Sequence, residues 1–288
     1  MDTTHNLLRA YQVLTHWIKS EKNKLIRRRT ESHNPSKILI QMKQEHNSEL
    51  LFQGPIADEY DMLKLICPSA AEMSQRVGEF IGDWTPLYPY THLNLLEIGC
   101  GTGITTAHLL ACRDHIEIVS VDNAPAMLSQ ARQNLAQVLE EGRLHLIEND
   151  ALSHLQGISN GSVDIIASAY ALHNFLNGYR CRVLEEIFRA LKPGGLFING
   201  DRYAVDDAAE HLRNTQEEVK GYFQVFLEMN RSDLLEQWIV HLFSDESEEH
   251  IMRLQPALET MTEIGFNDIG LHFRDGVNAL VSAVKPWP

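Results

Sequence analysis

The sequence predicts an α/β fold in which helices cover both faces of a mostly parallel sheet. From about residue 93 to residue 200, short apolar segments of strand type alternate with longer segments of helical spacing. Such alternation is typical of parallel strands joined by helices. A second observation is the turn Gly99-Cys100-Gly101-Thr102-Gly103, which directly follows the apolar segment 93–98. Because glycine has no Cβ, this turn can bring the backbone close to a ligand.

A helix over about 69–80 is expected first, because Pro68 is a favourable first-turn residue. The alternating region then predicts strands at 93–98, 116–121, 144–148, 163–168 and 195–200, and helices at 103–112, 124–140 and 179–191. After it, the aromatic stretch 204–243 and residues 247–264 have helical spacing, and strand-like segments follow near 267–274 and 277–284.

Composition restricts the kind of protein. Of the 288 residues, 44% are hydrophobic, which suffices for one large domain or two small ones. We expect a helical extension over 1–53 and a main domain over 54–288, into which 204–243 is inserted as a helical cap. No apolar run reaches the roughly 20 residues of a membrane helix. The scattered cysteines form no C-x-x-C pair, which favours a reduced, cytoplasmic protein without a structural zinc.

The net charge of −14 disfavours nucleic acid as a partner, because sequence-independent binding depends on neutralising phosphates. Basic residues gather near the N-terminus, where residues 1–50 hold nine lysines and arginines against five acidic residues. The arginine run 27–29 is interpreted as the solvated end of a helix over 5–29, with an RNA-binding arm as the alternative. The acidic remainder favours an enzyme that acts on a small molecule.

The N-terminal region carries two further features. Its apolar stripe over 5–26 needs a covering surface, either the main domain or a second subunit, and we expect a homodimer through these helices. Residues 37–51 are expected to form a second helix. The segment Leu51-Phe52-Gln53-Gly54-Pro55 is similar to a viral 3C protease recognition site, a common engineered scar. Because the residues before it do not look like an affinity tag, we interpret the segment as native.

Open parallel sheets bind ligands at the carboxyl ends of their strands. Besides the strand that ends at the glycine turn, three predicted strands end at residues that could contact a ligand. Asp122 follows the second strand and can accept hydrogen bonds from two ribose hydroxyls. Asn149-Asp150-Ala151 follows the third strand, where a carboxylate could accept from an exocyclic amine. Residues 168–174 follow the fourth strand and face the place of a reacting group.

Two common nucleotide sites do not fit the glycine turn. The dinucleotide fingerprint G-x-G-x-x-G requires glycine at 104, but that residue is Ile104 and the third glycine is Gly103. A P-loop requires G-K-[ST] after the turn, and none follows. The turn is therefore expected to accommodate an amino acid and a sugar.

With these motifs the chain resembles the class I S-adenosylmethionine-dependent methyltransferases. Glu97 to Gly103 match the first motif of that family, Asp122 matches its ribose-binding acid, and Asp150 matches its adenine-site acid. Leu191-Lys192-Pro193-Gly194-Gly195 matches the turn that enters its fifth strand. The resemblance covers about 93–201. It implies a Rossmann-like fold with a seven-stranded sheet of order 3-2-1-4-5-7-6 and an antiparallel seventh strand.

The resemblance also implies S-adenosyl-L-methionine as cofactor, with S-adenosyl-L-homocysteine as product. Upstream of the motifs, Tyr60 lies in a segment that resembles the tyrosine segment closing over the cofactor. The cofactor-binding residues that we predict are Tyr60, Glu97, Gly99, Gly101, Gly103, Asp122, Asn123, Met127, Asp150, Ala151 and Tyr170.

Some details resemble the carboxy-S-adenosylmethionine synthase branch, notably 122–127 and the ending 279–285. That branch uses an arginine in the helical segment after the fifth strand to hold the extra carboxylate. Arg231 lies in this region, but its neighbours do not reproduce the pattern. Ordinary methyl transfer is therefore preferred, the synthase reaction is the alternative, and a non-catalytic cofactor-binding assembly protein is the third hypothesis.

The acceptor site is expected beside the fourth and fifth strands. His173 is the candidate general base, because it follows the fourth strand and its ordinary pKa is about 6.5; alternatively it only caps or packs a short helix. The predicted substrate pocket comprises Arg202, Tyr203, Tyr222, Phe226 and Trp238. A surface or helix-end salt bridge is the alternative for Arg202, and core packing is the alternative for the aromatic stretch 217–240. No metal site is predicted, because His211, His241 and His250 are far apart in sequence.

Overall fold

The computed structural model describes residues 68–84, 92–113 and 116–288. The chain divides into two units, Met1–Asn47 and Ser48–Pro288, and all of the described residues belong to the second. The predicted N-terminal helices, the boundary at residue 53, the segment 51–55 and Tyr60 lie outside the described residues and stay predictions. Within the described part, no helix combines the length and apolar character needed to cross a bilayer.

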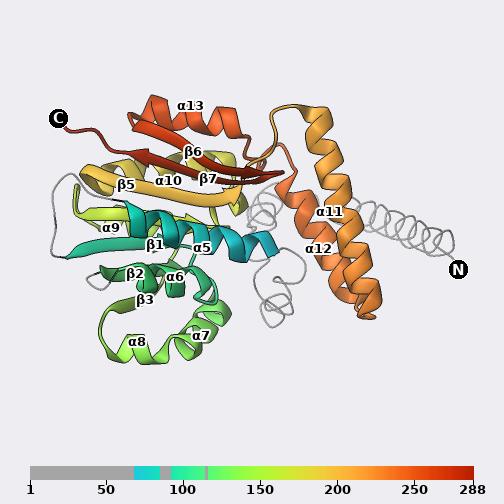
Figure 1. The fold of residues 1–288 in the computed structure, drawn as a ribbon, viewed down its shortest axis with the longest axis horizontal. Helices are drawn as coiled ribbons and strands as arrows, with labels where there is room; N and C mark the ends of the chain where they lie inside the picture. The colour runs from blue at the N-terminus through green and yellow to red at the C-terminus, as the bar shows by residue number, and fades with distance from the viewer. Residues whose placement is uncertain (1–67, 85–91, 114–115) are drawn as a thin grey trace, which may run out of the picture. The chain divides into compact units, whose positions relative to one another are not determined.

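A seven-stranded sheet of order β3-β2-β1-β4-β5-β7-β6 forms the centre of the domain (Figure 1). Strands β1 to β5 are parallel to one another, and β7 runs antiparallel to both β5 and β6. The predicted order and the antiparallel seventh strand are confirmed. The strands are β1 (Leu93–Ile98), β2 (Ile116–Asp122), β3 (Leu144–Glu148), β4 (Val163–Ala169), β5 (Leu191–Arg202), β6 (Asn267–Asp275) and β7 (Asn278–Val284).

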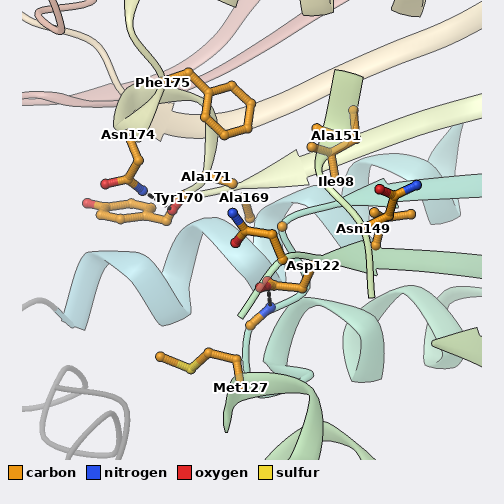
Figure 2. Close-up of a pocket in the computed structure, with 14 residues that line it drawn as sticks. Ile98, Asp122, Met127, Asn149, Ala151, Ala169, Tyr170, Ala171, Asn174 and Phe175 are labelled. Atoms are coloured by element: carbon orange, nitrogen blue, oxygen red, sulfur yellow. Dashed lines mark hydrogen bonds between the residues drawn. The ribbon is translucent and has the colours of Figure 1, made fainter. Parts of the chain in front are cut away.

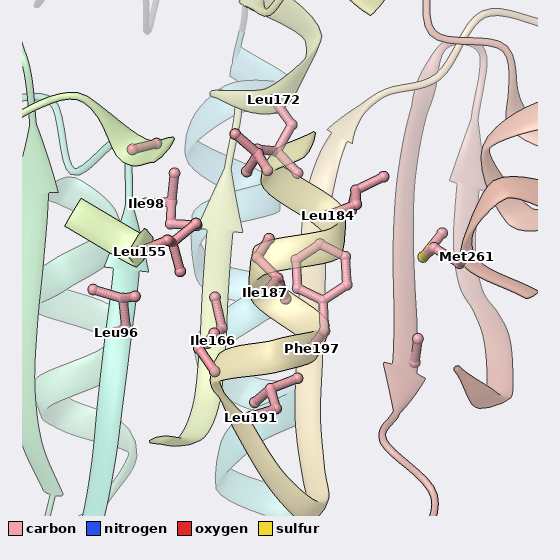
Figure 3. Packing of buried hydrophobic residues seen from close by; sticks show 14 of the residues in the cluster. Leu96, Ile98, Leu155, Ile166, Leu172, Leu184, Ile187, Leu191, Phe197 and Met261 are labelled. Atoms are coloured by element: carbon pink, nitrogen blue, oxygen red, sulfur yellow. The ribbon is translucent and has the colours of Figure 1, made fainter. Parts of the chain in front are cut away.

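Two layers of helices bury the faces of this sheet. One core contains side chains of α9, α10 and α13 against the strands, and Figure 3 shows its centre around Ile166, Ile187 and Phe197. The other core lies under α5 and α6. The helices are α5 (Pro68–Asp83), α6 (Ile104–Cys112), α7 (Pro125–Asn134), α8 (Ala136–Glu140), α9 (Ala151–Gly157), the 3₁₀ turn η3 (Leu172–Asn174), α10 (Asn177–Ala190), α11 (Ala208–Glu228), α12 (Ser232–Asp245) and α13 (Leu254–Ile264).

The predicted helix over 124–140 is wrong in one respect, because the structure has α7 and α8 with a break at Leu135. Leu135 leaves helical geometry at φ −116° and ψ 21°. Its side chain is buried, and a Cβ added to Gly103 would lie 2.7 Å from its Cδ1. The break therefore places an apolar side chain under the glycine turn, a tertiary contact that helical spacing does not reveal.

Two other boundaries differ from the prediction. Helix α13 begins at Leu254 rather than near 247, because Arg253 is extended and bridges Ala204. Strand β5 begins at Leu191 rather than 195, and its register against β4 shifts between Val163 and Ile165. The predicted Pro-Gly-Gly turn thus forms an irregular start of the strand.

Helices α11 and α12 form an antiparallel pair beyond the end of β5, and we call this pair the cap (Figure 1). The predicted helical character of 204–243 is confirmed. Phe226 is completely buried and Trp238 is 5% exposed, and both pack in a separate cluster with apolar residues of the two helices. Their aromatic surface therefore holds the two cap helices together.

Candidate functional site

A cavity lies at the carboxyl ends of β1, β2 and β4, between the loops that follow these strands (Figure 2). The space between the lining residues is about 630 Å³, and this value includes a part that is open to solvent. The lining residues are Ile98, Gly99, Gly101, Val121, Asp122, Asn123, Met127, Asn149, Ala151, Ala169, Tyr170, Ala171, Asn174 and Phe175. Of the predicted cofactor residues, seven are among them.

The glycine turn forms one side of this cavity. Gly99, Gly101 and Gly103 have φ values of +75°, +54° and +90°, which L side chains rarely adopt. A Cβ on Gly99 would lie only 2.3 Å from the Cβ of Ala171. The turn is thus pressed against the loop after β4. Gly103 does not line the cavity but caps α6 and packs over Leu135, so its predicted cofactor contact stays a prediction.

Asp122 is fixed at the end of β2 by the backbone on both sides of it. Its Oδ2 accepts a hydrogen bond from the N–H of Gly101 at 2.8 Å, and its Oδ1 accepts one from the N–H of Ala124 at 2.9 Å. Burial raises the pKa of Asp122, although these backbone hydrogen bonds oppose the rise. Because an ionised carboxylate has about four acceptor sites, Asp122 can accept from ligand hydroxyls beside these backbone donors.

Glu97 lies behind the cavity wall and is completely buried. Its Oε2 accepts hydrogen bonds from the hydroxyls of Thr106 and Ser120, each at 2.6 Å, whereas its Oε1 has no hydrogen-bond partner among the described residues. Burial raises the pKa of Glu97 to about 7. Its contacts show a side chain that joins β1 to α6 and β2, and its predicted contact with the cofactor stays a prediction.

The loop after β3 presents Asn149 and Ala151 to the cavity, while Asp150 turns to the helix that follows. Asp150 caps α9 by accepting from the N–H of Ser153 at 2.9 Å, and it also accepts from the hydroxyl of Tyr179 at 3.0 Å. Partial burial would raise the pKa of Asp150, but these hydrogen bonds outweigh it and lower the pKa. The predicted adenine contact of Asp150 is untested. Asn149 lines the cavity but was not among the predicted cofactor residues, although it belongs to the stretch named after the third strand.

The loop after β4 supplies Tyr170 and Asn174 (Figure 2). Tyr170 has a positive φ of 52° and its hydroxyl is hydrogen-bonded to Asn278 at the start of β7. Non-glycine residues in this conformation are strained and concentrate at functional sites. Asn174 belongs to the stretch 168–174 named from the sequence but was not among the predicted binding residues, and its neighbour Phe175 was not predicted at all. Their only signal is their position just after a strand end.

His173 lies in the same loop but does not line the cavity. It is 6% exposed, and its Nδ1 lies 2.5 Å from Oδ1 of Asp201, at the end of β5. Asp201 also accepts from the N–H groups of Leu172 and His173 through its other oxygen. The buried guanidinium of Arg180 donates to the carbonyls of this turn. His173 therefore packs in the η3 turn, which was the alternative expected from the sequence. Its role as a base stays a prediction.

The predicted substrate residues lie in two other environments. Arg202 donates to both oxygens of Glu218 at 2.7 and 3.0 Å and lies 3.4 Å from Glu246, so it forms an internal ion pair. Burial alone would lower the pKa of Arg202, but Glu218 outweighs it and raises the pKa. Tyr222 donates to the same Glu218. Tyr203 is 1% exposed and lies in the sheet core, where its hydroxyl accepts from Asn199.

The structure thus places seven of the eleven predicted cofactor residues around one cavity, whereas none of the predicted substrate residues lines it. Phe226 and Trp238 are core residues of the cap, in agreement with the packing alternative, and Tyr203 is buried in the sheet core. Arg202 and Tyr222 share Glu218 in a buried polar cluster beneath the cap. Their contact with a substrate stays a prediction. Ligand specificity on this fold depends on such details, which the strand pattern does not encode.

Comparison with known proteins gives the family context. Residues 95–195 match the profile of a methyltransferase domain family. Carboxy-S-adenosyl-L-methionine synthases from Photobacterium profundum and Photorhabdus laumondii are 21% and 26% identical over 241 and 253 residues. Each alignment spans 80% of this chain, with 90% and 91% of the relatives. A demethylmenaquinone methyltransferase from Leptospira interrogans is 34% identical over 110 residues, but these are 38% of this chain and 43% of that protein.

Solved structures agree in fold. An S-adenosyl-L-methionine-dependent methyltransferase from Methanococcus maripaludis matches with a TM-score of 0.54 and 17% identity over 81% of this chain and 93% of that one. An O-methyltransferase family protein from Burkholderia thailandensis matches with a TM-score of 0.55 and 15% identity over 80% and 59%. The domain match, the sheet order and the glycine turn with its partner Asp122 converge on one assignment. The chain therefore contains a methyltransferase domain over 95–195 and is similar, in that domain and in its fold, to the class I S-adenosylmethionine-dependent methyltransferases.

Proposed function

We propose that the cavity binds S-adenosylmethionine and that the enzyme transfers its methyl group to a small-molecule acceptor. The observation that carries this proposal is the position of the Asp122 carboxylate, which two backbone N–H groups hold at the cavity wall beside the glycine turn. A fixed carboxylate with free lone pairs suits the two hydroxyls of a ribose. The turn allows an amino acid to lie against the backbone.

The remaining wall fits the rest of such a cofactor. Apolar side chains of Val121, Met127, Ala151 and Phe175 offer surfaces for a flat, weakly polar base. The amide of Asn149 can both donate and accept at the base edge. The cavity therefore combines an acceptor for hydroxyls, an open backbone turn and an apolar slot.

When bound, the cofactor supplies an electrophilic methyl group on a sulfonium. The chain has to hold the acceptor in line with that group and exclude water, because orientation is the main requirement of such a displacement. Tyr170 and Asn174, which line the cavity on the β4 side, are the side chains that we propose for this task. His173 does not line the cavity but lies behind Tyr170 and Asn174. It could remove a proton only from a methyl acceptor that reaches beyond these two side chains.

The synthase reaction is the second candidate, because carboxy-S-adenosylmethionine synthases align with most of this chain. That chemistry requires a cation for the extra carboxylate. The cap and the end of β5 hold Arg202, which is paired with Glu218 and Glu246, and Arg231, which is paired with Asp233. Since both guanidiniums already have carboxylate partners, the geometry favours ordinary methyl transfer.

Mass spectrometry of the small molecules released from the purified, full-length protein tests the proposal. We expect S-adenosylmethionine or S-adenosylhomocysteine, and calorimetric titration of the stripped protein should show saturable binding of both. A released species heavier by one carbon dioxide would instead support the synthase reaction. Absence of binding for each of these molecules would contradict both proposals.

A further inference from the structure

Three buried side chains converge beneath the cap, outside the cofactor cavity. His173 comes from the η3 turn, while His241 and Asp245 lie one turn apart on α12. One ligand atom from each residue lies within 4.8 Å of the others, and Nε2 of His241 is 3.6 Å from Oδ2 of Asp245. We propose that His173, His241 and Asp245 bind a divalent transition-metal cation that links the cap to the η3 turn.

Asp201 supports this role by orienting His173. Oδ1 of Asp201 lies 2.5 Å from Nδ1 of His173, so an N–H at Nδ1 can donate to this carboxylate while Nε2 binds the cation. A carboxylate behind a histidine is the usual second contact of a metal-binding imidazole, since it fixes the tautomer and the ring orientation. Asp201 is itself fixed by the N–H groups of Leu172 and His173.

Asp245 gives a second, independent observation. Its side chain is 7% exposed, and its Oδ1 has no hydrogen-bond partner among the described residues. Leaving a buried carboxylate oxygen without a partner is costly. A cation at this position would satisfy it.

The charges around the three residues also favour a bound cation. The polar cluster beneath the cap contains four carboxylates, Asp201, Glu218, Asp245 and Glu246, and two guanidiniums, Arg180 and Arg202. With neutral histidines, the carboxylates exceed the guanidiniums by two charges. A dication would balance this excess without protonating an imidazole.

The ligand set indicates the class of ion. Two imidazoles and one carboxylate suit Zn²⁺, Fe²⁺ or Co²⁺, whereas Mg²⁺ and Ca²⁺ prefer oxygen ligands. Ligand atoms bound at about 2.0–2.2 Å lie at most roughly 4.4 Å apart, so small side-chain movements would close the site. Three protein ligands leave at least one position for water.

Cobalt binding to the untagged, full-length protein after treatment with a chelator tests the proposal without requiring cofactor or acceptor. We expect visible absorption bands that saturate at about one equivalent of Co²⁺, and a rise in melting temperature that excess chelator reverses. Asp245→Asn and His241→Gln keep similar side-chain shapes and should abolish the bands. Asp201→Asn should weaken binding about 10- to 100-fold.

His211→Gln is the matched control, because His211 is a buried histidine of the cap whose Nε2 contacts Glu246 rather than the three proposed ligands. This variant should retain the bands, and circular dichroism should show that all variants are folded. The wild-type titration is decisive by itself, since no variant has to fold for it. Absence of bands and of a thermal shift with Co²⁺ and Zn²⁺ would overturn the proposal, as would unchanged binding by both ligand variants.

Discussion

The backbone N–H of Gly101 donates a hydrogen bond of 2.8 Å to the carboxylate of Asp122, so the turn after β1 and the acid after β2 hold each other in place. Gly99 strengthens this junction because its N–H donates to the carbonyl of Val121, also at 2.8 Å. Two motifs separated in sequence therefore form one rigid wall of the cavity. The rigidity lowers the entropic cost of binding a ligand there.

Substitution of Asp122 by alanine should abolish most of the affinity for S-adenosylmethionine. The variant loses two proposed charge-assisted hydrogen bonds, each worth about 1.5–3 kcal/mol. The dissociation constant should therefore rise by at least about 100-fold. Calorimetric titration measures this change. Glu263→Ala, at an exposed position on α13, is the control and should bind like wild type. Affinity of Asp122→Ala within a few-fold of wild type would refute the assigned ribose contact.

Alanine at Gly99 should be far more destabilising than alanine at Gly142, although both have a φ of +75°. At Gly142 nothing lies within 4 Å of an added Cβ, so only the backbone strain of about 1–2 kcal/mol is expected. At Gly99 the added Cβ would collide with the Cβ of Ala171, and repulsion and loop displacement should bring the total above about 3 kcal/mol. Urea unfolding of both variants compares the two; equal losses of unfolding free energy would show that the contact with Ala171 is not fixed.

The sequence predicts the strands well, because segments such as 93–98 and 163–168 consist mainly of apolar residues and are almost entirely buried in the sheet. The sheet order came from the family resemblance, since no local pattern specifies which strands pair. The break at Leu135 was not predictable from spacing. It depends on a contact with Gly103, which is distant in the chain.

Site residues were predictable from the sequence only where a single residue at the end of one strand faces the cavity. Asp122 follows a strand and faces the cavity as expected. Side chains that combine across elements were not predictable: Tyr203 and Trp238 could serve a pocket or a core by composition, and the structure puts them in cores. Likewise, His173 and His241 meet only because the cap folds back over the η3 turn.

The loop after β3 allows the adenine contact to be assigned to one of two neighbours. Asn149 lines the cavity, whereas Asp150 caps α9. Asn149→Ala should therefore weaken cofactor binding about 10-fold, the loss of one hydrogen bond of about 1–1.5 kcal/mol, with little change in melting temperature. Asp150→Ser keeps a good N-cap and removes the carboxylate. If Asp150→Ser weakens binding and Asn149→Ala does not, the carboxylate contacts adenine as the family resemblance implies.

Glu97 should make the unfolding free energy depend on pH in a way that glutamine does not. Burial raises its pKa in the folded protein from about 4.5 to about 7, so folding favours the protonated form. Its contribution to stability is therefore complete below about pH 4.5 and is lost as the pH rises through 7, a change of about 3 kcal/mol. In Glu97→Gln, the remaining oxygen can still accept from Thr106 and Ser120, and no proton is released.

Urea unfolding of wild type and Glu97→Gln between about pH 5 and pH 8 measures this effect as a difference between the two proteins, which cancels the titration of other groups. The variant should gain stability relative to wild type as the pH rises. The exposed Glu263→Gln is the control and should give a difference that is flat over the same range. A flat difference for Glu97→Gln as well would mean that the carboxylate is ionised throughout, so that Ser120 and Thr106 compensate fully for its burial.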